Sequence, residues 1–203
     1  MNVIGLVISF GLLLVAMSIH EFSHGWVAYK LGDTTAKDQG RLTINPLAHI
    51  DPVGTILLPL FLFIATRGQF VFGAAKPVPI NYWALKNPKR DMIWIGLAGP
   101  LSNIIAAILC SQILKFIPHL PILSVLLTNF VFINVILGVF NLIPIPPLDG
   151  SRIVMGILPA AIAKSYASLE QFGFIIIMIF IALGLFNIVV WPIVNSIIVM
   201  LGL

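Results

Sequence analysis

The chain has 203 residues, of which 60% are hydrophobic and only 9% are charged, and its mean hydropathy is +1.10. These values exclude an ordinary soluble domain and indicate a polytopic membrane protein in contact with the lipid bilayer. The net charge of +4 would suggest nucleic acid as a partner in a soluble protein. Here the basic residues lie in the connections between apolar runs, so we expect no nucleic-acid partner.

Four long apolar runs divide the sequence, each near the length of about 20 residues that crosses a bilayer as a helix. They cover residues 3–19, 92–114, 122–143 and 172–191. The first run has neither the charged region before it nor the small-residue cleavage pattern after it that mark a signal peptide, so we expect it to be retained. The short connections predict one transmembrane domain over residues 1–203.

Basic residues are distributed unevenly between these connections. Only Lys115 lies in the link between the second and third long runs, and the connection between the first and second runs contains eight: Lys30, Lys37, Arg41, Arg67, Lys76, Lys86, Lys89 and Arg90. Cytoplasmic loops of membrane proteins contain the excess of Lys and Arg. The sequence therefore predicts a multi-pass protein of the cell membrane, with its N-terminus outside and the large basic connection in the cytoplasm.

The large basic connection contains a shorter apolar segment. Residues 31–55 are interrupted by Gly, Pro, Asn and Asp and predict a loop with room for a short strand. Residues 56–66 are too few for a spanning helix, and residues 68–80 alternate aromatic and aliphatic side chains, which predicts an edge strand or hairpin. A full crossing by 56–66 would turn the basic connection outward, so we expect a re-entrant segment over 52–80.

These patterns together predict an all-α polytopic membrane protein. We expect about five to six membrane-inserted helices, a re-entrant segment and a small membrane-associated β-hairpin.

The motif HEFSH, His20 to His24, follows the first apolar run directly. Two His residues at positions i and i+4 leave the same face of a helix and can bind one zinc ion. Glu21, beside the first of them, is placed to accept a proton from a water molecule activated by that zinc. A single buried His is usually a core residue, but three ionisable groups in an apolar helix require partners.

A third zinc ligand has to come from elsewhere, and few acidic residues are available. Asp33 and Asp38 lie in a polar loop and are expected to be solvated, and Asp91 reads as a helix-start residue. Asp149 is preferred, because prolines end the preceding helix and the glycine that follows allows a sharp turn close to a metal. A helix N-cap is the alternative for Asp149, and Asp51, before a proline, is the second candidate ligand.

These residues lie within longer segments that resemble one known family. The segments HEFSH, GRLTINPLAHIDPVGT, GAAKPVPIN, AGPLSN and NLIPIPPLDGSR look like the site-2 protease family of intramembrane zinc metalloproteases. The similarity runs in order from His20 to Arg152, most of the chain. It is strongest to the compact bacterial and archaeal branch of the family, which has no PDZ or CBS domain.

The resemblance implies hydrolysis of a peptide bond in a transmembrane segment of a membrane-protein substrate near the cytoplasmic side, as in regulated intramembrane proteolysis. It implies one zinc per chain, held by His20, His24 and Asp149, with Glu21 as the catalytic acid and base. The family's glycine-and-asparagine motif matches Gly99 to Asn103, and its asparagine before the LDG turn matches Asn141. Asn103 and Asn141 are therefore candidate substrate-binding residues.

From the residues alone, other interpretations stay open. Asn103 is equally well explained as a polar contact between helices, and Asn134, on the same helix face as Asn141, is expected to be structural. A zinc or proton transporter would need further acidic groups across the membrane, and none lies within 92–114 or 122–143. A non-catalytic membrane chaperone on the same scaffold would not need Glu21.

The segment from Phe70 to Ile80 raises the question of how a buried helix is cut. A substrate helix has to unwind beside protein groups that replace its backbone hydrogen bonds, since lipid offers none. An edge strand over Phe70–Ile80 could supply these groups by strand addition. The alternative is a packed hairpin that only plugs the cavity.

Overall fold

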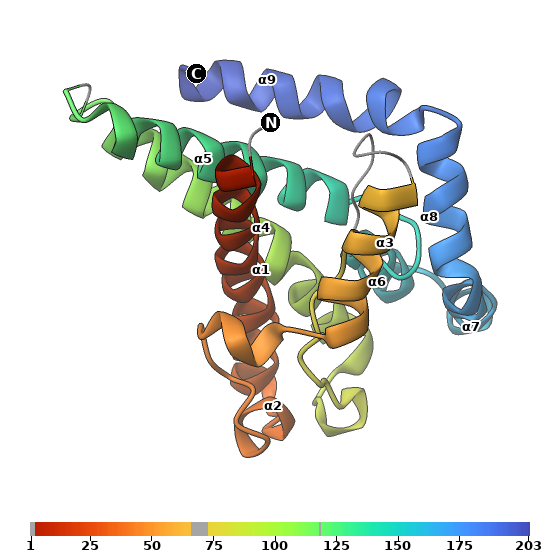
Figure 1. Ribbon diagram of the computed structural model, residues 1–203. Helices are drawn as coiled ribbons and strands as arrows, with labels where there is room; N and C mark the ends of the chain where they lie inside the picture. The colour runs from red at the N-terminus through yellow and green to blue at the C-terminus, as the bar shows by residue number, and fades with distance from the viewer. Residues whose placement is uncertain (1–2, 66–72, 118) are drawn as a thin grey trace.

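The computed structural model describes residues 3–65, 73–117 and 119–203, and within these residues it is mostly helical (Figure 1). Four helical stretches are long and apolar enough to cross a membrane. Three are the single helices α1 (Val3–Leu31), α4 (Pro88–Leu114) and α5 (Pro121–Asn141). The fourth runs from Ala160 to Ala182 and combines α7 (Ala160–Ala167) with α8 (Gly173–Ala182). The chain is thus a multi-pass membrane protein, as predicted.

Helix α4 lies at the centre of the fold. It packs against α1, α5 and α6 (Asp149–Ile157), so the three segments of the sequence that contain candidate site residues meet on one helix. A second contact region, below α9 (Trp191–Leu201) in Figure 1, is formed by buried apolar side chains of α4, α5, α8 and α9. These side chains include Ala107, Val131, Val135, Phe180, Val194 and Ile198.

Residues 52–65 form a short apolar helix, whose first part (Pro52–Leu57) is π-helical and whose second part is α3 (Leu58–Ala65). At 1.5 Å per residue it spans about 20 Å, less than the hydrocarbon core of about 30 Å. A helix of this length is compatible with the expected re-entrant segment. Insertion of this helix and of the other short apolar helix, Phe186–Leu201, stays a prediction, and so does the total of five to six inserted helices.

The predicted β-hairpin is not supported. Residues 73–81 are irregular and contain no strand, and neither do residues 41–45. The first part of the predicted hairpin, residues 66–72, lies outside the described residues. The backbone after it is held by single contacts, with the N–H of Ala74 donating to the carbonyl of Gly54 and the N–H of Lys76 donating to the carbonyl of His49. Two prolines in this segment have no N–H to give to a strand ladder.

One predicted span is displaced. The apolar run 172–191 is not one helix, because α8 ends at Ala182 and the chain turns before α9. Gly184 at this turn has a φ of 72°, a left-handed conformation that ends helices and that only glycine adopts readily. The stretch that is long and apolar enough to cross a membrane therefore begins earlier, at Ala160, and the end of the run belongs to the next helix.

Candidate metal centre

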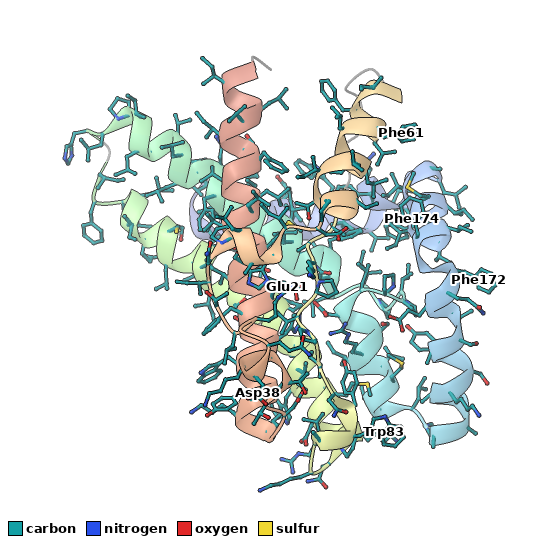
Figure 2. The ribbon with its side chains drawn as sticks, turned by 60° about the horizontal axis from the view of Figure 1, so that its bottom comes forward. Glu21, Asp38, Phe61, Trp83, Phe172 and Phe174 are labelled. Carbon is teal, nitrogen blue, oxygen red and sulfur yellow. The ribbon has the colours of Figure 1, made fainter. Side chains whose placement is uncertain are left out.

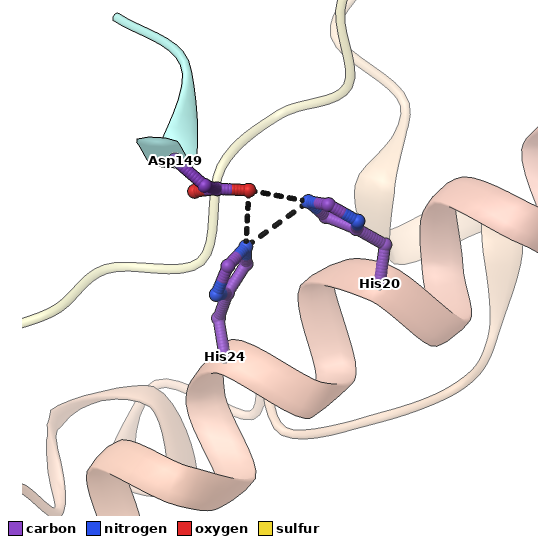
Figure 3. A group of neighbouring side chains, drawn as sticks. All are labelled: His20, His24 and Asp149. Carbon is purple, nitrogen blue, oxygen red and sulfur yellow. Dashed lines mark hydrogen bonds and ion pairs between the residues drawn. The ribbon is translucent and has the colours of Figure 1, made fainter. Parts of the chain in front are cut away.

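Helix α1 and the first turn of α6 bring three metal-ligating side chains together (Figure 3). The Nε2 atoms of His20 and His24, one turn apart on α1, are 3.0 Å from each other. Asp149 Oδ2 lies 2.9 Å from the first of these nitrogens and 3.1 Å from the second. All three residues are buried. The spacing of HEFSH and the choice of Asp149 thus predicted a group that meets in space.

These three atoms fit a zinc ion. Zinc bonds of about 2 Å in a tetrahedral site place neighbouring ligand atoms about 3.3 Å apart, close to the separations found here. Room for an ion is left by Gly99 of α4, where a Cβ would lie 2.6 Å from His20 Nε2 and nearer still to His24 Nε2. Two imidazole nitrogens and one carboxylate oxygen form the donor set of many catalytic zinc sites, which keep a fourth position open.

The other ring nitrogens of the two His residues are also engaged. His24 Nδ1 lies 2.6 Å from the carbonyl oxygen of Ile95, and His20 Nδ1 lies 2.6 Å from Asn103 Oδ1. Both oxygens can only accept a hydrogen bond, so each Nδ1 has the proton and donates. Each Nε2 then has a lone pair directed at the point between the three side chains, which is the form of His that binds a metal.

Asp149 is held in place by tight packing of the first turn of α6 against the end of α5. It is the first residue of α6, and the N-cap position belongs to Leu148, so the N-cap interpretation is wrong. A Cβ on Gly150 would collide with the carbonyl oxygens of Leu142 and Ile143, so the turn presses directly against the end of α5. The other carboxylate oxygen, Oδ1, lies 3.7 Å from Arg152 Nη1.

The charge of Asp149 is set by two opposing effects. Burial raises the pKa of its carboxyl, but the positive charge of His24 and His20 in their protonated form, together with their hydrogen bonds, outweighs burial and holds the pKa well below its usual range. The carboxylate is therefore available in its ionised, metal-binding form.

Glu21 contacts the irregular segment that replaces the predicted hairpin. Its Oε2 accepts a hydrogen bond of 2.8 Å from the backbone N–H of Val78. Figure 2 shows Glu21 partway along α1, and its side chain is only partly buried. Val78 itself is buried, and Gly25 of α1 lets it approach closely, since a Cβ on Gly25 would lie 2.9 Å from Val78 Cγ1.

The acidic residues considered beside Asp149 have other roles. Asp33 is buried, not solvated as expected, and accepts hydrogen bonds from the N–H groups of Thr35 and Asn81. Asp51 caps the helix that follows it by accepting 2.5 Å from the N–H of Gly54. Asp91 lies in the first turn of α4, as predicted, and Asp38 is exposed.

The two asparagines predicted to bind substrate differ in their surroundings. Asn103 is fully buried beside His20, and its Nδ2 donates to Asn134 Oδ1 and to the carbonyl of Ala16. Every polar atom of Asn103 is thus engaged by protein, which favours a role in orienting His20 over contact with a substrate. Asn141 lies at the end of α5 and donates to the carbonyl of Leu137 in its own helix.

Sequence reasoning did not find the roles of Gly99 and Val78, and it treated Asn134 as structural. The space that Gly99 leaves depends on how closely α4 packs against α1, which local spacing does not encode. The sequence did indicate that Asn134 has a hydrogen-bond partner, because a polar amide in an apolar span needs one. That partner lies on another helix.

A protein with membrane-spanning helices and a buried His–His–Asp group belongs to the class of membrane metalloproteins. The model of peptidase family M50 matches residues 119–186. The chain is 38% identical over 193 residues, 91% of this chain and 84% of the relative, to a Bacillus subtilis protein named "Putative zinc metalloprotease YwhC". The chain therefore belongs to peptidase family M50, the site-2 protease family, as the sequence motifs predicted, and zinc is the cofactor of this family.

Other relatives extend beyond this chain. It is 31% identical to "Putative zinc metalloprotease Rip2" of Mycobacterium tuberculosis over 82% of this chain and 63% of the relative. It is 30% identical to "Zinc metalloprotease MJ0392" of Methanocaldococcus jannaschii over 80% of this chain and 36% of the relative. No match to a solved structure was found.

Proposed function

We propose that this chain is an intramembrane zinc endopeptidase that hydrolyses a peptide bond in a transmembrane segment of another membrane protein. The observation that carries the proposal is the convergence of His20, His24 and Asp149 at one buried point, with Glu21 beside it in the sequence. His20, His24 and Asp149 would hold one zinc ion per chain. We treat residues 1–203 as one protease domain.

The chemistry divides between the metal and Glu21. Zinc, when bound, lowers the pKa of a coordinated water and polarises the scissile carbonyl. Glu21 would accept the proton of the attacking water and deliver it to the departing amide nitrogen, as a general base that becomes a general acid. Its place next to a ligand, and not among the ligands, keeps its carboxylate off the metal and available for this transfer.

The depth of the site supports cleavage near one membrane surface. His20 lies 11 residues before the end of α1 at Leu31, a rise of about 16 Å, compared with a hydrocarbon core of about 30 Å. The loop that follows Leu31 begins the basic connection, so the site would face the cytoplasm under the positive-inside rule.

The segment after residue 72 bears on how a substrate is received. Arg41 Nη2 donates to the carbonyls of Lys76 and Pro77, and the N–H of Val78 is bonded to Glu21. The N–H groups of Lys76 and Val78 and the carbonyls of Lys76 and Pro77 are thus already engaged, which favours a packing role for this segment. Strand addition over 70–72 stays a prediction, since these residues are not described.

The transporter and chaperone alternatives receive less support. Across residues 3–65, 73–117 and 119–203, one group of three metal-ligating side chains is found. A transport path would need further ligating groups along the membrane normal. A chaperone would need no Glu beside the first His ligand.

Substitution of Glu21 by Gln tests the proposed reaction. Glu21→Gln should abolish cleavage of a membrane-embedded substrate while zinc remains bound at one per chain, because the carboxylate moves protons and does not hold the metal. The measurements are metal content of the purified protein and cleavage of co-expressed small membrane proteins. A fully active Glu21→Gln protein would refute the mechanism.

A further inference from the structure

A buried row of hydrogen bonds links the proposed zinc site to α5. It begins at His20 Nδ1, which donates to Asn103 Oδ1 over 2.6 Å. Asn103 Nδ2 donates to Asn134 Oδ1 over 2.8 Å, and Asn134 Nδ2 donates to the carbonyl of Phe130 over 2.8 Å. Asn103 and Asn134 have no exposed surface, so water does not compete for these bonds.

Each hydrogen bond in this row has only one possible assignment of donor and acceptor. The carbonyl of Phe130 accepts but cannot donate, so Asn134 must turn its NH2 group to that carbonyl and its Oδ1 to Asn103. Asn103 meets two acceptors, Asn134 Oδ1 and the carbonyl of Ala16, and must turn its own NH2 group to them. Its Oδ1 then faces His20, whose Nδ1 has to hold the proton.

We propose that Asn103 and Asn134 are positioning residues that fix His20 in its metal-binding tautomer and ring orientation, with the direction set by the Phe130 carbonyl. The inference rests on the proposed zinc site and adds two residues to it. Asn134 touches no ligand and acts through Asn103. Outer hydrogen bonds of this kind set the orientation and basicity of metal-binding His residues.

Polar contacts between membrane helices also exist without any function at a metal. Such a contact would affect the stability of the protein but not its affinity for zinc once folded. The two roles are separated by measuring the zinc dissociation constant of the full chain in detergent by competition with a chelator, together with its thermal stability.

The test combines two substitutions and their double variant. Asn103→Leu should weaken zinc binding by about 10-fold to 100-fold, the usual loss for a removed outer partner of a metal ligand. Asn134→Leu should weaken it in the same sense by a smaller factor. The double variant should bind zinc no more weakly than Asn103→Leu alone, because Asn134 has no path to His20 except through Asn103.

Two further variants separate the bond to Asn103 from the presence of a polar group. Asn134→Ser can bond back to the Phe130 carbonyl within its own helix but does not reach Asn103. It should therefore weaken zinc binding by the factor expected for Asn134→Leu, and it provides the measurement if the Leu variant fails to fold. Asn134→Asp keeps an acceptor for Asn103 and should retain most of the affinity. Ser111→Ala is the control, because Ser111 is buried in α4 and its hydroxyl donates to the carbonyl of Ile108 in the same helix.

Unchanged zinc affinity in Asn134→Ser, or additive losses in the double variant, would overturn the inference. His20→Ala is measured alongside, and if it binds zinc as the parent does, the proposed zinc site itself is wrong. These measurements use no substrate, so they are independent of whether the chain cleaves membrane segments.

Discussion

Glu21 and its two neighbouring His residues differ in which of their polar atoms the fold turns toward the metal site and which it bonds to other parts of the protein. In His20 and His24 each Nδ1 donates to a protein oxygen, and only the Nε2 atoms face the space beside Gly99. In Glu21 one carboxylate oxygen accepts from Val78. The local spacing of HEFSH explains why the two rings share a face, and the contacts from α4 explain which nitrogen each ring presents.

At Gly99 a single methyl group should interfere with metal binding. In Gly99→Ala the new Cβ would occupy space beside both Nε2 atoms, and overpacking of this kind costs about 1–3 kcal/mol, or about 5-fold to 150-fold in zinc affinity. Chelator competition measures the change. Gly11→Ala in α1 is the control, since nothing lies within 4 Å of its Cβ. Equal zinc affinity in both variants would contradict the assigned position of the ion.

Substitution of Asp149 and of Asp51 tests which of the two acidic residues is the third zinc ligand. Asp149→Ala should lose most bound zinc, because it removes one of three ligands. Asp51→Ala should keep zinc and lose about 1 kcal/mol of stability with its helix cap. Metal analysis and thermal unfolding of both proteins decide the matter, and zinc loss in the Asp51 variant alone would reassign the third ligand.

Much of the site could be predicted at the level of residues, for a physical reason. An ionisable group in an apolar span requires a partner, so His20, His24 and Asp149 stood out against their surroundings. Asp33 was predicted wrongly because it lies in a polar loop, and only the fold brings the N–H of Asn81 to it. Asn134 showed its polarity in the sequence, but its partner comes from another helix.

At the scale of elements, the corner between α8 and α9 depends on one glycine. Gly184→Ala would place a side chain at a φ of 72°, which costs about 1–2 kcal/mol. The melting temperature should fall, while zinc affinity should stay as in the parent, because the corner makes no contact with the described metal site. Unchanged melting would mean that the corner is not held in this conformation.

Helices were predicted more accurately than their ends or the irregular segments between them. An apolar run reports that a segment is helical, because lipid leaves no other way to satisfy backbone groups. It does not report where the helix stops, so 172–191 was assigned as one span although Gly184 divides it. Alternation between residues 68 and 80 suggested a hairpin, but the described part of that segment bonds to α1 and to residues 41–55, not to another strand.

At the scale of the whole molecule, the distribution of Lys and Arg makes orientation testable. In a Cys110→Ala background, a cysteine at Lys37 or Lys89 should be protected from an impermeant thiol reagent in intact cells, and one at His119 should be labelled. All three positions are exposed on the protein, so access depends on the side of the membrane. Labelling at Lys89 but not at His119 would reverse the orientation.

The contact between Glu21 and Val78 has a consequence for selectivity. Val78 lies between Pro77 and Pro79, so its N–H is the one amide donor in that triplet, and Glu21 already accepts it. At rest, the backbone N–H of Val78 therefore occupies one carboxylate oxygen of Glu21, the proposed general base. An incoming peptide has to compete with that internal ligand, and a stably wound helix, whose N–H groups are satisfied within itself, has none to offer. Under the proposed function, we therefore expect ordinary membrane helices to be spared and segments that unwind readily to be cut.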